Sequence, residues 1–239
     1  MVKLLYYSIT IQLLLTLPVF ANEKDILYKS TMILAPKMFS AKVKMIISEP
    51  EQKREYLFKI LRKNSQVLIH FLFPSINKGR KILRCKDNYF LYLPSVNKTI
   101  KVTPKQKLVN SDFSIEDITC LELKNNYIVK NIITDENNNY QLFLNAKNRS
   151  ISYANIKFYV HKTSFMPLKQ IFYTSNGILL KSILFSKIQI YNNSFKRPSL
   201  FKMYYNFNKN KKTTVSYLQF CIEDNIDDFF FNLESLDKF

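Results

Sequence analysis

The chain has 239 residues and a formal net charge of +18, and its apolar content of 47% is enough to build a buried core. It contains only two glycines, Gly79 and Gly177, which lie far apart. Nucleotide-binding loops and the nucleophile elbow of hydrolases need closely spaced glycines, because the backbone must approach a phosphate or turn sharply. The composition therefore excludes these motifs.

Residues 1–21 are typical of a cleavable secretory signal peptide. Lys3 precedes an apolar run, and Val19 and Ala21 supply the β-branched and small side chains that fit before a cleavage site. The alternative is a membrane anchor, which the short run with its internal polar side chains disfavours. We therefore expect the mature chain, residues 22–239, to be exported, most simply to a bacterial periplasm, without a transmembrane span.

The positive charge has two interpretations. It can indicate an anionic partner, such as nucleic acid, phospholipid headgroups or an acidic protein. It can also reflect a lysine-rich proteome whose lysines lie on solvated strand faces. The 36 Lys and Arg residues are scattered along the chain rather than gathered into one arm, which favours the second interpretation. Nucleic acid is disfavoured further, because an exported protein rarely meets it.

In chain order, the pattern predicts one helix and then a series of short strands. The helix is expected over residues 25–39, with Pro36 limiting its far end. From Ala41 onward the apolar residues alternate with polar ones, which is typical of half-buried strands. About ten or eleven such strands follow, separated by Asn-rich turns. A capped helical turn is expected over residues 111–117, and a docking turn over residues 227–236.

The strands have one apolar face and one polar face, so the sheet must curl and its apolar face must be covered. We expect a mainly β fold with a few helices (α+β): a single curved antiparallel sheet that forms an unclosed β-barrel, covered by the amino-terminal helix and a mid-chain helical lid, in one domain. Alternation predicts inward positions that either pack as ordinary core or line a ligand cavity. These candidates are Val43, Met45, Ile47, Phe158, Val160, Met203, Tyr205, Leu218 and Phe220.

Three groups of motifs carry a resemblance to a known family. They are Lys78-Gly79 with Tyr89–Pro94 and Ser111–Phe113, then Met166–Gln170 with Asn176-Gly177, and then Asp227-Asp228 before Phe231-Asn232-Leu233. In these motifs the chain resembles the outer-membrane lipoprotein-sorting protein family, periplasmic carriers similar to LolA. It departs from the family pattern at Phe90, Lys98 and Asn110, where a tryptophan, an arginine and a glycine are usual.

The resemblance implies a half-barrel that holds acyl chains between sheet and lid. It implies an acylated lipoprotein or lipid as cargo, with an inner-membrane release complex and an outer-membrane acceptor as partners. Its lid and motif candidates are Phe90, Tyr92, Pro94, Ser111, Asp112 and Phe113. Ser111–Phe113 either shapes a lid loop or caps a helix, and the cap is the simpler interpretation. With no histidine nearby, Glu116 and Asp117 are expected to be solvated residues of the first helical turn.

Catalysis, a metal and a cofactor are not expected. The chain has two histidines and no C-x-x-C, so neither metal-ligand nor thioredoxin spacing occurs. Cys85, Cys120 and Cys221 leave three pairings open and at least one thiol, and we expect them to be mostly buried. Two further functions remain as alternatives. One is a non-catalytic envelope structural or interaction module without lipid cargo. The other is an integral outer-membrane barrel, which residues 234–239 disfavour because they lack alternating apolar positions.

Overall fold

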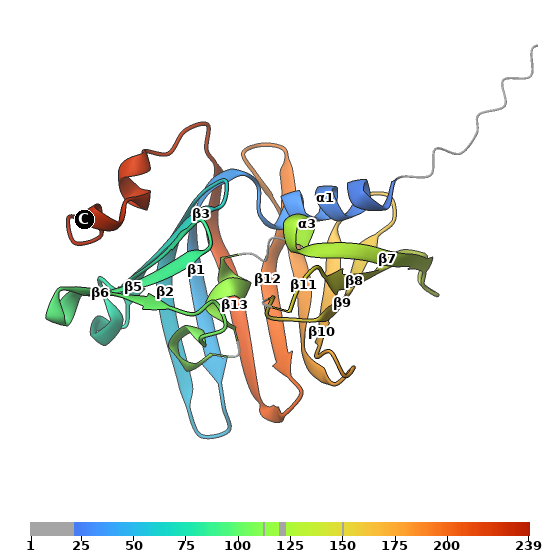
Figure 1. Ribbon diagram of the computed structural model, residues 1–239, viewed down its shortest axis with the longest axis horizontal. Helices are drawn as coiled ribbons and strands as arrows, with labels where there is room; N and C mark the ends of the chain where they lie inside the picture. The colour runs from blue at the N-terminus through green and yellow to red at the C-terminus, as the bar shows by residue number, and fades with distance from the viewer. Residues whose placement is uncertain (1–21, 112, 120–122, 150) are drawn as a thin grey trace, which may run out of the picture.

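The computed structural model describes residues 22–239, except residues 112, 120–122 and 150 (Figure 1). The predicted signal peptide, Asp112 and Cys120 therefore lie outside the described residues. In the described part, all strands belong to one antiparallel sheet of thirteen strands, which curls without closing. The predicted unclosed, mainly β architecture is confirmed. No helix in this part is long and apolar enough to cross a membrane.

The elements follow one another mostly as hairpins. The helices are α1 (Glu23–Leu34), α2 (Ile115–Ile118) and α3 (Leu123–Asn126). The strands are β1 (Met38–Ser48), β2 (Lys53–Lys63), β3 (Gln66–Phe73), β4 (Lys81–Cys85), β5 (Asn88–Leu93), β6 (Lys98–Val102), β7 (Tyr127–Thr134), β8 (Asn139–Ala146), β9 (Asn155–His161), β10 (Pro167–Tyr173), β11 (Leu179–Tyr191), β12 (Phe195–Tyr205) and β13 (Asn208–Ile222).

Two predicted features differ from these bounds. The described part has thirteen strands, more than the expected ten or eleven. The amino-terminal helix ends at Leu34 rather than at residue 39. Pro36 disfavours helical geometry in the residue before it, and the alternating burial of β1 has begun by Phe39.

The strand order places β6 at one edge of the sheet and β7 at the other, with β1 paired to β13 in the middle. The chain leaves β6 and enters β7 through residues 103–126, which carry α2 and α3. This connection must therefore cross the open side of the half-barrel, over the inner face of the sheet (Figure 1). We call residues 103–126 the lid; residues 112 and 120–122 within it are not described.

The sheet is packed on both faces in different ways. Its inner face carries the main core, and every second residue of β1 from Phe39 to Ile47 is buried there. A smaller outer cluster contains Leu68, Leu83, Tyr92, Ile226, Phe231 and Leu236. It forms because the carboxy-terminal segment folds back over β3–β5, where Lys81 Nζ donates to the Leu236 carbonyl at 2.6 Å. The predicted docking turn is confirmed as two short 3-10 helices, Asp228–Phe231 and Leu233–Ser235. Cys221, in contrast, is exposed and not buried as expected.

A β-bulge in β13 overturns one inward assignment. Val43 pairs with Tyr217 and Lys42 with Gln219, so Leu218 has no partner on β1. The extra residue shifts the alternation, as bulges do. Tyr217 and Phe220 are therefore buried, whereas the Leu218 side chain is 50% exposed. The prediction that Leu218 faces inward is wrong.

Because of the bulge, Leu218 and Phe220 contribute unequally to the free energy of unfolding. We expect Phe220→Ala to lower the free energy of unfolding by about 3–5 kcal/mol, because it opens a cavity in the core. Leu218→Ala, its matched control two residues away, should change it by less than about 0.5 kcal/mol. Urea unfolding followed by circular dichroism measures both. Equal losses in the two variants would place Leu218 inside and contradict the bulge.

Candidate functional site

The inner face of the sheet brings most of the predicted cavity residues together. Val43, Met45, Ile47, Phe158, Val160 and Met203 are fully buried, and Phe220 is buried as well. One row of paired residues crosses the sheet from Ile47 through Thr213, Met203, Ile183, Gln170 and Phe158 to Leu142. Tyr205 lies half-buried next to a register shift at the end of β12. The candidates thus belong to one hydrophobic cluster, apart from Leu218 and the partly exposed Tyr205.

The motif residues divide between the two faces of the sheet. Phe90 and Tyr92 belong to the outer cluster under the carboxy-terminal segment, on the side away from the lid. Pro94 begins a 3-10 turn at the end of β5 and lies next to Gly79, whose positive φ of 81° favours glycine. Of the described motif residues, Ser111 and Phe113 are in the lid. Phe90, Tyr92 and Pro94 are therefore fold residues of the outer layer and not part of the lid.

The lid fills the inner face with its own apolar side chains. Leu108, Phe113, Ile115, Ile118 and Leu123 are all buried in the main core. Phe113 and Leu123, together with Leu34 and Ala35 of α1, line a cavity of about 40 Å³ against β10–β12. Such a cavity holds about one water molecule. A cavity of this size has no room for an acyl chain.

The helix cap lies three residues later than predicted. Ser111 Oγ makes a local turn, donating to the Phe113 carbonyl and accepting from the Phe113 amide, both at 3.1 Å. The N-cap of α2 is Ser114, whose hydroxyl accepts from the Asp117 amide at 3.2 Å. Asp117 in turn accepts from the Ser114 amide at 2.7 Å, which completes a capping box. The prediction of a capped turn is thus right in kind and wrong in the capping residue.

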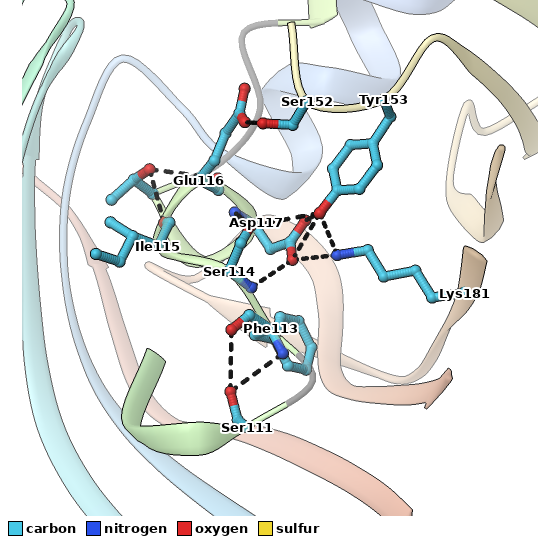
Figure 2. A network of polar contacts seen from close by, with 10 residues as sticks. Ser111, Phe113, Ser114, Ile115, Glu116, Asp117, Ser152, Tyr153 and Lys181 are labelled. Atoms are coloured by element: carbon cyan, nitrogen blue, oxygen red, sulfur yellow. Dashed lines mark hydrogen bonds and ion pairs between the residues drawn. The ribbon is translucent and has the colours of Figure 1, made fainter. Parts of the chain in front are cut away.

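Asp117 is also the centre of a buried polar cluster, shown in Figure 2. Its carboxylate forms an ion pair with Lys181 of β11; the Asp117 side chain is 0% exposed and that of Lys181 is 4% exposed. The Tyr153 hydroxyl donates to Asp117 at 3.1 Å and also contacts Lys181 Nζ. Burial raises the pKa of Tyr153 well above its ordinary value, so the phenol stays protonated. The expectation that Asp117 is solvated is wrong, because the fold of the lid brings the Asp117 side chain into contact with the inward-facing Lys181.

Glu116, beside it, is buried too and was also expected to be solvated. Its carboxylate accepts a hydrogen bond from Ser152 (Figure 2). Burial raises the pKa of Glu116 above the ordinary value of 4.5, and the neighbouring Asp117 adds to the effect. The Ser152 hydrogen bond and the charges of Arg84 and Lys181 oppose that shift but do not cancel it. The lid therefore carries two adjacent buried carboxyl groups in different electrostatic settings.

Two arginines of the sheet hold the ends of the covering helices. Arg62 of β2 donates to the Thr119 carbonyl at the end of α2, at 3.1 Å. Arg197 of β12 donates to the Leu34 carbonyl at the end of α1, also at 3.1 Å. The guanidinium of Arg197 lies 3.9 Å from the Tyr217 ring centre and 4.0 Å from that of Phe220. Both arginines satisfy carbonyls that a helix end leaves without an intrahelical partner.

These inward cations and Tyr153 were not identified from the sequence. Lys181 occupies an inward position of β11, two residues before buried Ile183. The alternation along this strand could have identified it as a lysine at an apolar position. Arg62 likewise follows Phe58 and Ile60 on the inner face of β2. Nothing in the sequence, however, pairs either cation with the lid, because the partners are far apart along the chain.

Comparison with known proteins places this architecture. A family model described as an uncharacterized protein matches residues 63–238. The chain belongs to that family. No curated protein sequence matches it. Among solved structures, a LolA superfamily protein from Nitrosomonas europaea has a TM-score of 0.76 at 21% identity, covering 87% of this chain and 96% of its own.

Two further structures agree with this likeness. A putative outer membrane lipoprotein-sorting protein domain from Vibrio parahaemolyticus has a TM-score of 0.72 at 19% identity, covering 88% of this chain and 99% of its own. A DUF1329 family protein from Desulfovibrio piger has a TM-score of 0.78 at 18% identity, covering 89% of this chain and 97% of its own. The predicted resemblance to lipoprotein-sorting proteins is confirmed, and the fold is LolA-like.

The buried carboxyl of Glu116 predicts a pH-dependent stability in this LolA-like chain. Its raised pKa means that the folded state holds the proton more tightly than the unfolded state does. The stability it contributes is therefore present below pH 4.5 and is lost as the pH rises through the raised value. We expect Glu116→Gln to gain stability over the wild type as the pH increases from about 4.5 to about 8.

Thermal unfolding across this pH range measures the difference, with exposed Glu51→Gln as the control that should show no such trend. A Glu116→Gln protein that loses stability relative to the wild type as the pH rises would contradict the assignment. Its Ser152 hydrogen bond and nearby cations would then outweigh the burial.

Proposed function

We propose that this chain is a periplasmic carrier that takes the acyl chains of a lipoprotein or lipid onto the inner face of its sheet when the lid lifts. The proposal rests on what covers the inner face of the sheet. An apolar surface running across the sheet is occupied by side chains of one connecting segment, which is fixed by a few buried polar contacts. The LolA-like fold supports it.

The energetics of the lid fit such an exchange. The helices α2 and α3 have four residues each, far too few to be stable by themselves. The position of the lid therefore depends on the packing of its buried apolar side chains and on the polar contacts of Asp117 and Thr119. A buried methylene contributes about 0.8 kcal/mol, so one long acyl chain contributes roughly 10 kcal/mol before ordering and opening costs. Cargo could therefore displace the lid side chains.

Export and partners belong to the same proposal. The amino-terminal pattern supports passage to the periplasm, and a carrier there would receive cargo from an inner-membrane complex and deliver it to an outer-membrane acceptor. We infer a non-catalytic role, in which binding and release are the whole activity. The residual cavity of about 40 Å³ favours a second candidate, an envelope interaction module on the same fold that never opens.

Loosening the lid separates the two candidates. Lys181→Gln leaves the buried Asp117 carboxylate without its cation, which destabilises the closed lid. When the competent state is a minor population, apparent affinity rises with that population. We therefore expect Lys181→Gln to bind a fluorescent triacylated peptide about 10-fold more tightly or better than the wild type, measured by anisotropy. Phe113→Ala, which removes a plug, should act in the same direction.

Lys44→Gln is the matched control, because it breaks the surface pair of Lys44 with Glu55 at 2.7 Å and leaves the lid intact. Its affinity should equal that of the wild type. Circular dichroism first establishes that each variant is folded. If folded wild type, Lys181→Gln and Phe113→Ala all fail to bind the peptide, the carrier proposal is overturned in favour of the interaction module.

A further inference from the structure

The charges of the chain are unevenly distributed. Residues 137–222 contain eleven lysines, two arginines and no aspartate or glutamate. These residues include all of β8 to β13, so half of the sheet carries cations without a carboxylate of its own. Scattered lysines alone would be ordinary, but in a stretch of this length without acidic residues only carboxylates from other parts of the chain can compensate the positive charge.

Strand pairing places several of these lysines on the outer face of β8–β12. Phe158, Ile183 and Met203 face inward, so the residues that alternate with them face outward. Two rows of directly paired residues then cross the outer face. They are Tyr159–Lys169–Leu184–Lys202 and Phe143–Lys157–Ile171–Ser182–Tyr204–Lys212.

Lysines and aromatic rings touch along these rows. Lys157 Nζ lies 5.5 Å from the centre of the Phe143 ring, and Lys169 Nζ lies 5.9 Å from that of Tyr159. Lys212 Nζ lies 5.6 Å from the Tyr204 ring centre. The ammonium groups of these lysines therefore lie over aromatic rings of the same face, within the range of a cation–π interaction.

The end of the β11–β12 hairpin adds an exposed apolar element to the same face. Ile188 and Ile190 are 58% and 60% exposed. They pair with Pro198 and Lys196, and Lys187 at the same end is exposed as well. A pair of isoleucines so exposed beside lysines is suited to an environment that is apolar inside and anionic at its surface.

We propose that the outer face of β8–β12, with Ile188 and Ile190 at its tip, docks on a membrane surface rich in anionic phospholipid. Protein interfaces are depleted in lysine, which disfavours a protein partner for this face. At a bilayer surface, lysines meet lipid phosphates, tyrosines take the interfacial level and isoleucines enter the acyl region. This docking is independent of the carrier function, because its residues lie on the side of the sheet opposite the lid.

The absence of tryptophan from the chain gives a direct test of the tip. Ile190→Trp places a single fluorescent reporter on the proposed contact. Ile76→Trp places one at a matched isoleucine, 79% exposed, outside that face. With extruded vesicles of phosphatidylglycerol and phosphatidylethanolamine, we expect the emission of the Ile190→Trp protein to move to shorter wavelength and that of the Ile76→Trp protein to stay unchanged. Any result in which the Ile190→Trp protein shifts no further than the Ile76→Trp protein would overturn the proposal.

Lysine substitution tests the charge. We expect Lys157→Gln, Lys169→Gln and Lys202→Gln, combined in the full chain, to weaken vesicle partitioning on the order of 100-fold in co-sedimentation at low salt. The control combines Lys42→Gln, Lys53→Gln and Lys59→Gln on the outer side of β1 and β2, where Glu55 is also present. It should bind like the wild type, and phosphatidylcholine vesicles should bind neither protein.

Equal losses in the two triple variants would show that net charge alone attracts the chain, and would overturn the assignment to this face. Wild-type protein that fails to bind anionic vesicles would overturn it as well, even if the triacylated peptide still binds. If the triple variant of Lys157, Lys169 and Lys202 still binds vesicles, the contact is made through the cargo site. That result would also overturn the assignment to this face. Circular dichroism checks that each variant is folded.

Discussion

The structure depends on one constraint: a single curled sheet has an apolar inner face, and that face must be covered. Strand order determines what covers it. Because β6 and β7 form the two edges, the segment between them has to cross the open side. That segment is the lid, with Phe113, Ile115 and Ile118 buried against the sheet. The amino-terminal helix α1 contacts α3, β10 and β12 and covers the remainder. The strand order alone thus places the lid across the open side of the half-barrel, whatever side chains it carries.

Polar contacts then fix how the lid sits. A lid held by apolar packing alone would be stable in many slightly different positions, because apolar attraction is not directional. The Asp117–Lys181 pair and the bond from Arg62 to the Thr119 carbonyl each allow one geometry. Buried ion pairs add little stability compared with well-packed apolar groups, but breaking one is costly. Such contacts therefore define one closed position of the lid. How well that position is defined is separable from how strongly the apolar side chains of the lid pack against the sheet.

Sequence patterns predicted the parts of this structure that depend on neighbouring residues. Val43, Met45 and Ile47 were assigned inward because alternation along β1 is uninterrupted. Leu218 was misassigned because its bulge is fixed by pairing with β1 and leaves no local mark. Ser114 and Asp117 do form a local capping-box pattern, so that cap could have been found. The burial of Asp117 could not, because Lys181 reaches it only through the fold.

The same contrast explains the two sides of the sheet. On the inner side, each identified cation has a lid or helix group to meet, as Lys181 meets Asp117 and Arg197 meets the Leu34 carbonyl. On the outer side of β8–β12, the cations come from a stretch without carboxylates. The inner cations Lys181 and Arg197 therefore contact groups of the protein itself, whereas we assign the outer cations of β8–β12 to an external anion. Since the two faces are separated by the thickness of one sheet, a surface bound to the outer face would not compete with cargo for the inner one.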